Sequence, residues 1–406
     1  MPAVTFFIKF VIIGFQMNKL ISFIKREPVL FAAVLLAVVS VVIIRPEPYL
    51  CLQAIDFRTL AILFSLMIVI KAFQSQNFLN VIAARLLRLC KTQRSLYFLM
   101  TLLVFFSSMF VTNDVALLTF VPITILIFTR IGLPCLKLVV LETLAANLGS
   151  CITPMGNPQN LYLFSYYGFS AGDFFALTAR IAVPSLFILC VMILFITRKP
   201  HKNPETDASA TPASGTLDHN ILQTQVSFIT FDFRTVLYIA DFILCLLTVF
   251  HFVNYLIMLG VTVVVMLACN FRLFKKVDYS LLLTFVGFFI FTKTLSTVPA
   301  FCNFINSMLS TPLKTYITGI LTSQVISNVP AALLLSGFTG NGDMLLLGVN
   351  VGGLGTLIAS MASVISFKIY NNSEEAKTPA GKKYFGMFTL YNVVLLVILG
   401  IIVGVL

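Results

Sequence analysis

Eleven long apolar runs, separated by short polar stretches, dominate the sequence and restrict what it can fold into. About 20 apolar residues span a bilayer as an α-helix, and each run is close to that length or longer. Charged residues make up only 10% of the chain, whereas roughly a quarter is usual in soluble domains. The sequence therefore predicts an all-α polytopic membrane protein. The runs lie at about 29–45, 57–73, 97–128, 135–165, 174–197, 235–252, 254–270, 279–298, 313–338, 344–367 and 385–406.

Two of these runs carry polar residues at their centres. Residues 112–114 (Thr-Asn-Asp) interrupt the run at about 97–128, and residues 327–330 (Ser-Asn-Val-Pro) interrupt the run at about 313–338. A polar break in mid-membrane frees backbone groups, which is tolerated only inside protein or beside a water-filled cavity. We therefore predict two re-entrant hairpins, each made of two half-helices that meet at a polar tip.

The basic residues indicate the orientation in the membrane. The net charge is +12, and Lys and Arg concentrate in cytoplasmic segments of membrane proteins. If both hairpins are non-crossing and residues 18–28 are cytoplasmic, most Lys and Arg residues fall on the cytoplasmic side. This distribution predicts nine crossings in the cytoplasmic (inner) membrane, or about 9–10 transmembrane helices if the N-terminus adds one. It explains the positive charge without a nucleic-acid partner.

The same pattern divides the chain into four segments. Residues 1–27 form an N-terminal lead, a partial or extra span, for which Met1 and Met17 are alternative starts. Residues 28–197 and 234–406 form two repeats, each with a hairpin and a broken helix, at about 135–165 and 344–367. The linker at 198–233 is rich in Pro, Ser, Thr, Asn and Asp and is expected to face the cytoplasm.

Polar markers recur in the same order in both repeats. An odd number of predicted crossings separates the two copies, so the second copy should be inverted relative to the first. Secondary transporters are built in this way, with their sites where broken helices meet near the bilayer midplane. The markers are Asp56, Lys71, residues 108–113, Asn147, Gly149 and Thr153 in the first repeat, and Asp278, Lys293, residues 323–328, Asn350, Gly352 and Thr356 in the second.

The polar tips offer groups of both signs. A half-helix N-terminus suits an anion, whereas free carbonyls and hydroxyls suit a cation. Asp114 is a costly carboxylate at membrane depth, expected to bind a coupling cation or carry a proton; a helix-capping charge is the alternative. Lys71 and Lys293 are read as snorkelling residues, with attraction of an anion as the alternative. The amphipathic, basic stretch 77–88 predicts an interfacial helix.

Four motifs give the chain a family resemblance: residues 112–114 with Pro122, residues 156–160 (Gly-Asn-Pro-Gln-Asn), residues 327–330, and residues 352–356 (Gly-Gly-Leu-Gly-Thr). With them the chain resembles the ion transporter superfamily of sodium-coupled dicarboxylate and citrate carriers, arsenite permeases and sodium–proton antiporters. The resemblance implies a homodimer with an elevator-type transport domain. It also implies one sodium site formed by Ser108, Thr112 and Asn113 with the Gly156 loop, and a second formed by Ser323, Ile326 and Asn328 with the Ala359 region.

The tips depart from the carrier pattern at one position. The carriers bear a Ser-Asn-Thr triplet, and its threonine is replaced here by Asp114 in one half and Val329 in the other. The Asn-Asp pair more closely resembles the arsenite permease tip. Counting Asp114 as a ligand in both roles, we predict these sites: for substrate Asn113, Asp114, Asn157, Ser327, Asn328 and Thr356; for a coupling ion Ser108, Thr112, Asn113, Asp114, Gly156, Ser323, Ile326, Asn328 and Ala359.

These features favour a secondary active transporter of a small inorganic or organic anion, with Na+ or H+ as coupling ion and no cofactor or other metal. An arsenite-type efflux permease or a cation–proton antiporter is the first alternative, and a channel or membrane enzyme ranks lower. The sequence contains no Walker motif. Its histidines, His201, His219 and His251, lie in the linker or at a span end, which argues against an enzyme. Its eight cysteines are scattered and are read as packing residues.

Overall fold

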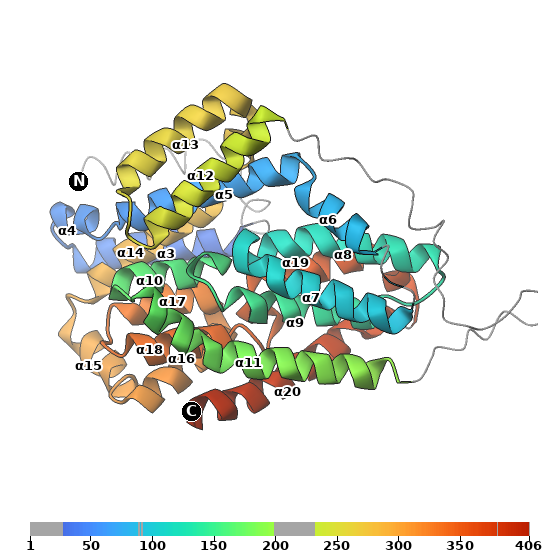
Figure 1. Ribbon diagram of the computed structural model, residues 1–406. Coiled ribbons are helices and arrows are strands. Elements are labelled where there is room, and N and C mark those ends of the chain that lie inside the picture. Colours follow the sequence, from blue (N-terminus) through green and yellow to red (C-terminus); the bar gives the residue numbers. More distant parts are fainter. Residues whose placement is uncertain (1–26, 88–89, 91, 199–231, 380, 406) are drawn as a thin grey trace, which may run out of the picture.

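The computed structural model describes residues 27–87, 90, 92–198, 232–379 and 381–405, which form helices joined by short connections, without a β-strand (Figure 1). The predicted all-α polytopic architecture is confirmed. The first half contains α3 (Pro28–Ile44), α4 (Pro48–Gln53), α5 (Phe57–Ser75), α6 (Phe78–Leu87), α7 (Gln93–Val111), α8 (Asn113–Arg130), α9 (Leu136–Ser150), η1 (Pro154–Gly156), α10 (Pro158–Tyr167) and α11 (Ala171–Ile196).

From Tyr279 onward the second half repeats the order of α5 to α11, with two short 3-10 turns added before its last helix. It contains α12 (Phe233–Val249), α13 (Tyr255–Asn270), η2 (Phe271–Lys276), α14 (Tyr279–Leu295), α15 (Pro299–Met308), α16 (Pro312–Ile326), α17 (Asn328–Ser336), α18 (Gly342–Val351), η3 (Leu357–Ala359), α19 (Met361–Asn371), η4 (Glu375–Lys377), η5 (Gly381–Lys383) and α20 (Tyr384–Val405). Most of the lead at 1–27 and of the linker at 198–233 lies outside the described residues, so their predicted roles stay predictions.

By length and composition, six helices among the described residues can cross a membrane, and the bent pair of α14 and α15 would make a seventh. The sequence predicted about 9–10, with α7 and α8 as half-helices of a non-crossing hairpin. In the structure these two helices have 19 and 18 residues and are counted among the six. The difference has a physical origin: spans that are broken at a polar stretch appear as short pieces, such as α9 with α10 and α18 with α19. In addition, α3 and α12 have 17 residues each, at the short end of what spans a bilayer.

The first hairpin consists of α7 and α8, which meet at Thr112. The rings of Tyr97, near the start of α7, and Phe128, near the end of α8, lie 5.8 Å apart between centroids. The chain therefore reverses direction at Thr112. Because Thr153, just after the end of α9, bonds the carbonyl of Met109 close to the tip, the tip lies beside the break in this helix.

The second hairpin consists of α16 and α17, which meet at Ser327. Asn341, which follows α17, donates a 3.3 Å hydrogen bond from Nδ2 to Oγ1 of Thr315 in the first turn of α16. This contact joins the two outer ends of the hairpin, so the chain reverses here too.

Two aspartates begin matching helices. Asp56 Oδ1 accepts the backbone N–H of Thr59 at 3.0 Å, and Asp278 Oδ1 accepts that of Leu281 at 3.0 Å. Such N-caps satisfy donors that have no partner in the first turn. A short helix follows each of these long ones: α6 follows α5, and α15 follows α14 at a bend of 106°. The sequence predicted α6 as an interfacial helix, but α15, its counterpart, was not anticipated.

The helices gather into two apolar cores. One is formed mainly by α7, α8, α9, α11, α19 and α20, and the other by α5, α10, α12, α13, α14, α17 and α18. In Figure 1, α5, α12 and α13 lie together, apart from the bundle that contains α7, α9 and α19. Helix α18 lies where the two cores meet, since Leu345 belongs to one core and Leu347 to the other.

Candidate functional site

The two hairpin tips have the same backbone conformation. Thr112 has φ 70° and ψ 152°, and Ser327 has φ 76° and ψ 154°. Positive φ is rare for a residue with a Cβ, and for a β-branched residue it requires support from the surrounding structure. The sequence match between the tips therefore reflects a shared and strained backbone geometry at the start of α8 and of α17.

Each hairpin packs closely against the broken helix of its own half. A Cβ on Gly149 of α9 would lie 2.6 Å from Ser108 Oγ, and a Cβ on Gly352 would lie 2.8 Å from Ser323 Oγ. Only glycine permits this approach. The two serine hydroxyls are completely buried and donate to carbonyls of their own helices, at 2.8 and 2.7 Å. Ser108 and Ser323, both predicted ion ligands, thus occupy equivalent positions beside a helix break.

A threonine in each half ties the unwound segment to the hairpin. Thr153 donates its hydroxyl to the carbonyl of Met109, and Thr356 donates to the carbonyl of Gln324 at 3.1 Å. Thr153 and Thr356 match in the sequence, as do Met109 and Gln324. The same bond in both halves holds the break next to the last turn before the tip.

Asn147 of α9 binds the broken helix of the second half. Its Oδ1 accepts from Ser360 Oγ at 2.8 Å, and its Nδ2 donates to Ser363 Oγ at 3.1 Å. All three residues are at least nine-tenths buried.

Asn350 of α18 makes the reciprocal contact with the first half. Its Nδ2 donates to Asn160 Oδ1 at 2.7 Å, and its Oδ1 accepts from Asn157 Nδ2 at 3.3 Å. Asn157 and Asn160 lie 10 and 13 residues after Asn147 in the sequence, and Ser360 and Ser363 lie 10 and 13 residues after Asn350. Two equivalent sets of polar contacts therefore cross at one point, as a pseudo-two-fold arrangement requires.

The tip asparagines are buried beside this crossing. Asn113 is 6% exposed and donates from Nδ2 to Asn147 Oδ1 at 3.4 Å, while its own Oδ1 caps the N–H of Asp114 at 2.9 Å. Asn328 is 5% exposed, and its Nδ2 lies 2.9 Å from where a Cβ on Gly353 would be. Amide groups of this kind offer both donors and acceptors, at the positive ends of two half-helices.

Asp114 is the charged residue of the first tip. It is half-buried, and its carboxylate lies within electrostatic range of Lys71 on α5 and Asp278 before α14. Lys71 Nζ donates to Gln74 Oε1 at 3.1 Å. Among the described residues no cation forms an ion pair with Asp114 within 4.0 Å, so the carboxylate remains available to an ion.

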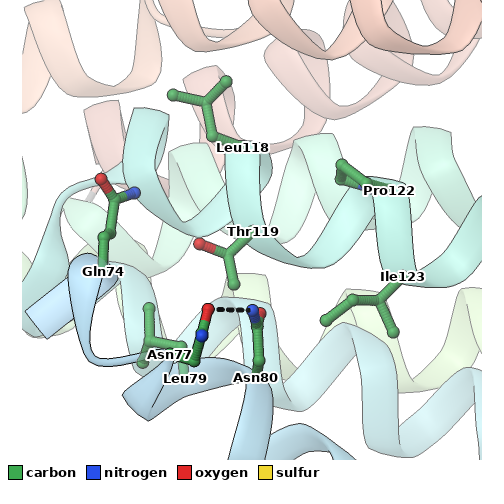
Figure 2. Close-up of a pocket in the computed structure, with 8 residues that line it drawn as sticks. All are labelled: Gln74, Asn77, Leu79, Asn80, Leu118, Thr119, Pro122 and Ile123. Atoms are coloured by element: carbon green, nitrogen blue, oxygen red, sulfur yellow. Dashed lines mark hydrogen bonds between the residues drawn. The ribbon is translucent and has the colours of Figure 1, made fainter. Parts of the chain in front are cut away.

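A pocket of about 310 Å³ lies between α8 and the segment where α5 leads into α6 (Figure 2). Leu118 and Pro122, four and eight residues after Asp114, share one face of the helix with it. Pro122 lacks the N–H that would bond the Leu118 carbonyl, which leaves this oxygen free. The opposite wall comes from the end of α5 and the start of α6. The lining is formed by Gln74, Asn77, Leu79, Asn80, Leu118, Thr119, Pro122 and Ile123.

The remaining predicted ligands differ in burial and in the contacts that they make. Ser327 Oγ donates to the Ala359 carbonyl at 3.3 Å, so these two are brought together. Gly156 packs on the Ser150 carbonyl, 2.2 Å from where its Cβ would be. Ile326 is half-buried at the end of α16, and Thr356 is exposed. Their roles as ligands stay predictions.

Gln324 is a site residue that the sequence analysis did not single out. Its Nε2 donates to the carbonyls of Gly352 and Leu354, at 2.8 and 3.0 Å, and its Oε1 accepts the N–H of Thr356 at 2.9 Å. One side chain therefore satisfies three backbone groups of the unwound stretch. Its position one helical turn before the Ser-Asn tip was the available signal.

The chain is similar in sequence to known membrane transporters. Residues 19–339 match the citrate transporter family. A transporter of Methanocaldococcus jannaschii is 31% identical over 331 residues, covering 80% of this chain and 85% of that protein. The inner membrane protein YbiR of Escherichia coli is 30% identical over 348 residues, covering 84% and 85%. A protein of Dictyostelium discoideum named as an arsB transporter is 25% identical over 151 residues, covering 37% and 27%.

Proposed function

We propose, since the chain belongs to the citrate transporter family, that it is a secondary active transporter of a small anion driven by a sodium or proton gradient. Membership of this family makes it a multi-pass membrane transporter of anions or ions. That the substrate is a small anion, and that sodium or protons drive its transport, is what we propose beyond family membership.

The reciprocal contacts of Asn147 and Asn350 carry this proposal. Asn147 also accepts the tip amide of Asn113, and its partner Ser360 follows Ala359, whose carbonyl accepts from Ser327 of the second tip. Uncharged donors and the partial positive charge of two half-helix N-termini near these contacts can hold an anion. Hydroxyls and free carbonyls beside the same breaks supply oxygen ligands for a cation. A substrate and a coupling ion could thus bind side by side.

The mechanism we propose is an elevator-type movement in a homodimer. The hairpins and broken helices would shift against the body formed by α5, α12 and α13, which pack on one another. Large apolar side chains exposed on α12 and α13, such as Ile243 and Val264, suit lipid or a second subunit. We place the protein in the inner membrane, as its relative YbiR is named, with the linker in the cytoplasm.

Uptake into proteoliposomes tests the proposal. Labelled citrate, succinate, sulfate and phosphate would be offered under imposed sodium or proton gradients. We expect accumulation of at least one anion above the level of empty vesicles, and loss of that accumulation for Asn113→Ala and Asn328→Ala. If no gradient drives accumulation of any anion, symport of an anion is wrong.

Asp114 favours a second candidate on the same fold, namely arsenite efflux or cation–proton exchange. The second tip has Val329 at the matching position, so a negative charge enters only one half. A relative named as an arsB transporter agrees with this alternative over part of the chain. Inverted vesicles that take up labelled arsenite, or that exchange Na+ for H+ without any anion, would favour it over anion symport. A channel would instead conduct without accumulation.

A further inference from the structure

Glu142 is a completely buried acid within α9. Its Oε1 accepts a hydrogen bond from the hydroxyl of Thr124 on α8, whereas its Oε2 has no hydrogen-bond partner in the part of the chain that the structure describes. Among the same residues, no Lys, Arg or His forms an ion pair with it. A group this isolated needs a physical explanation.

A charged carboxylate would be expensive at this place. One neutral donor does not compensate for the loss of water around an ion, and an intramembrane acid without a partner marks a functional site by default. The titratable groups of neighbouring elements within electrostatic range of Glu142 are Tyr97 of α7, Cys135 before α9 and Tyr384 of α20. All three are neutral at neutral pH, so none can balance a negative charge.

The second half shows that packing does not require an acid here. Glu142 lies five residues before Asn147, and the residue five before Asn350 is Leu345. Leu345 is also completely buried. Since leucine fills the equivalent position, the two halves differ at Glu142. Packing of this fold does not require a buried carboxyl group here, although burying one costs free energy.

A row of polar groups connects the level of Glu142 with the hairpin tip. Thr143, its neighbour on α9, shares a 2.6 Å hydrogen bond with Ser366 of α19. One turn further along α9, Asn147 bonds Ser363 and receives the amide of Asn113. A movement at the tip would therefore change the packing between α8, α9 and α19, which are the helices that enclose the acid.

We propose that Glu142 carries a proton through the transport cycle and that, together with Asp114 at the tip, it couples transport to the proton gradient. In the closed arrangement the acid is neutral, and on rearrangement of α8 against α9 its O–H bond breaks and the proton passes to water. A metal ion would need several oxygen ligands at once, whereas a proton needs one acceptor oxygen. This inference rests on the proposed transport function and specifies its coupling ion.

Infrared spectroscopy of the purified protein tests the proton directly. The carbonyl stretch of a protonated carboxylic acid should be present at neutral pH, and Glu142→Gln should remove its share of that band. The matched control is Asp241→Asn, because Asp241 is 2% exposed, has a single donor, Thr262 Oγ1 at 2.8 Å, and leaves Oδ2 without a partner. Asp241 lies on α12, outside the row of polar groups.

Transport supplies the second measurement. A pH gradient should accelerate uptake of labelled citrate, sulfate or arsenite by native protein and by Asp241→Asn, but not by Glu142→Gln. If Glu142→Gln disturbs folding, Glu142→Leu is used in its place, because leucine fills the equivalent position 345 of the second half. An unchanged infrared band in a folded Glu142 variant, or an unchanged response to the gradient, overturns the proposal. If native protein moves none of the probes, the proposed function fails, and the infrared band alone decides whether Glu142 holds a proton.

Discussion

Asn147 and Asn350 occupy equivalent positions, and each binds the broken helix of the opposite half. The contacts are reciprocal: the partners of Asn147 are Ser360 and Ser363, and those of Asn350 are Asn157 and Asn160. Polar groups buried in this way are costly unless they are paired. The crossing therefore fixes how the two halves meet, and with it the geometry of the central site.

We expect Asn147→Ala and Asn350→Ala to destabilise the protein by similar amounts, about 1–3 kcal/mol each, because each leaves buried partners unsatisfied. Transport should fall in both. The control is Asn392→Ala, since Asn392 is also fully buried but donates only to the Phe388 carbonyl of its own helix. Thermal unfolding in detergent and vesicle uptake check this. Normal transport in either central variant would contradict a shared site at the crossing.

Asp114→Asn should abolish coupling to the driving ion while the protein still folds. The change keeps the shape of the side chain and removes the only charge of the first tip. The measurement is uptake with and without the imposed gradient, at matched expression. Asp173→Asn is the control, because Asp173 is an exposed acid in the first turn of α11. Coupling that survives in Asp114→Asn would remove this residue from the ion site.

Thr112→Gly should raise thermal stability. Threonine at φ 70° and ψ 152° costs about 1–3 kcal/mol, against about 0.5–1 kcal/mol for the greater freedom of glycine in the unfolded chain. Its hydroxyl makes no capping hydrogen bond in the structure. Ser327→Gly should gain less, because it also loses the 3.3 Å bond to the Ala359 carbonyl. Equal or reversed shifts in melting temperature would show that the tip conformation is not strained.

His251 should make stability depend on pH. It lies in the turn between α12 and α13, where Arg58 Nη2 is 2.9 Å from its Nδ1. Burial and the charge of Arg58 lower the pKa of His251 below its ordinary value of 6.5. The folded state therefore binds fewer protons than the unfolded state in mild acid. The contribution of neutral His251 to the free energy of unfolding is thus present above pH 6.5 and is lost as the pH falls through the pKa of the folded state.

The check is thermal unfolding across mildly acidic and neutral pH for native protein and His251→Asn. Asparagine tolerates the positive φ of 71° at this position and does not titrate in this range. The variant should lose part of the destabilisation by acid. An identical pH profile for both proteins would contradict a role for this pair.

Much of the fold could be read from the sequence. The apolar runs required a helical membrane protein, since continuous apolar runs of about 20 residues match the length of a transmembrane helix and not that of a transmembrane strand. The polar residues at 112–114 and 327–330 marked both hairpin tips, and equal spacing identified Asn147 with Asn350. In contrast, α15 was not anticipated, because the apolar run before it gives no sign of the 106° bend.

What the sequence determined by itself was the local order of elements: apolar periodicity, caps and polar breaks are properties of neighbouring residues. The tertiary structure alone decided which groups share a site. It placed Asn147 beside Ser360 and Gln324 across the unwound stretch after Gly352, and it left one oxygen of Glu142 without a partner. Such relations join residues far apart in the chain, so they depend on how helices pack in space, which no local pattern specifies.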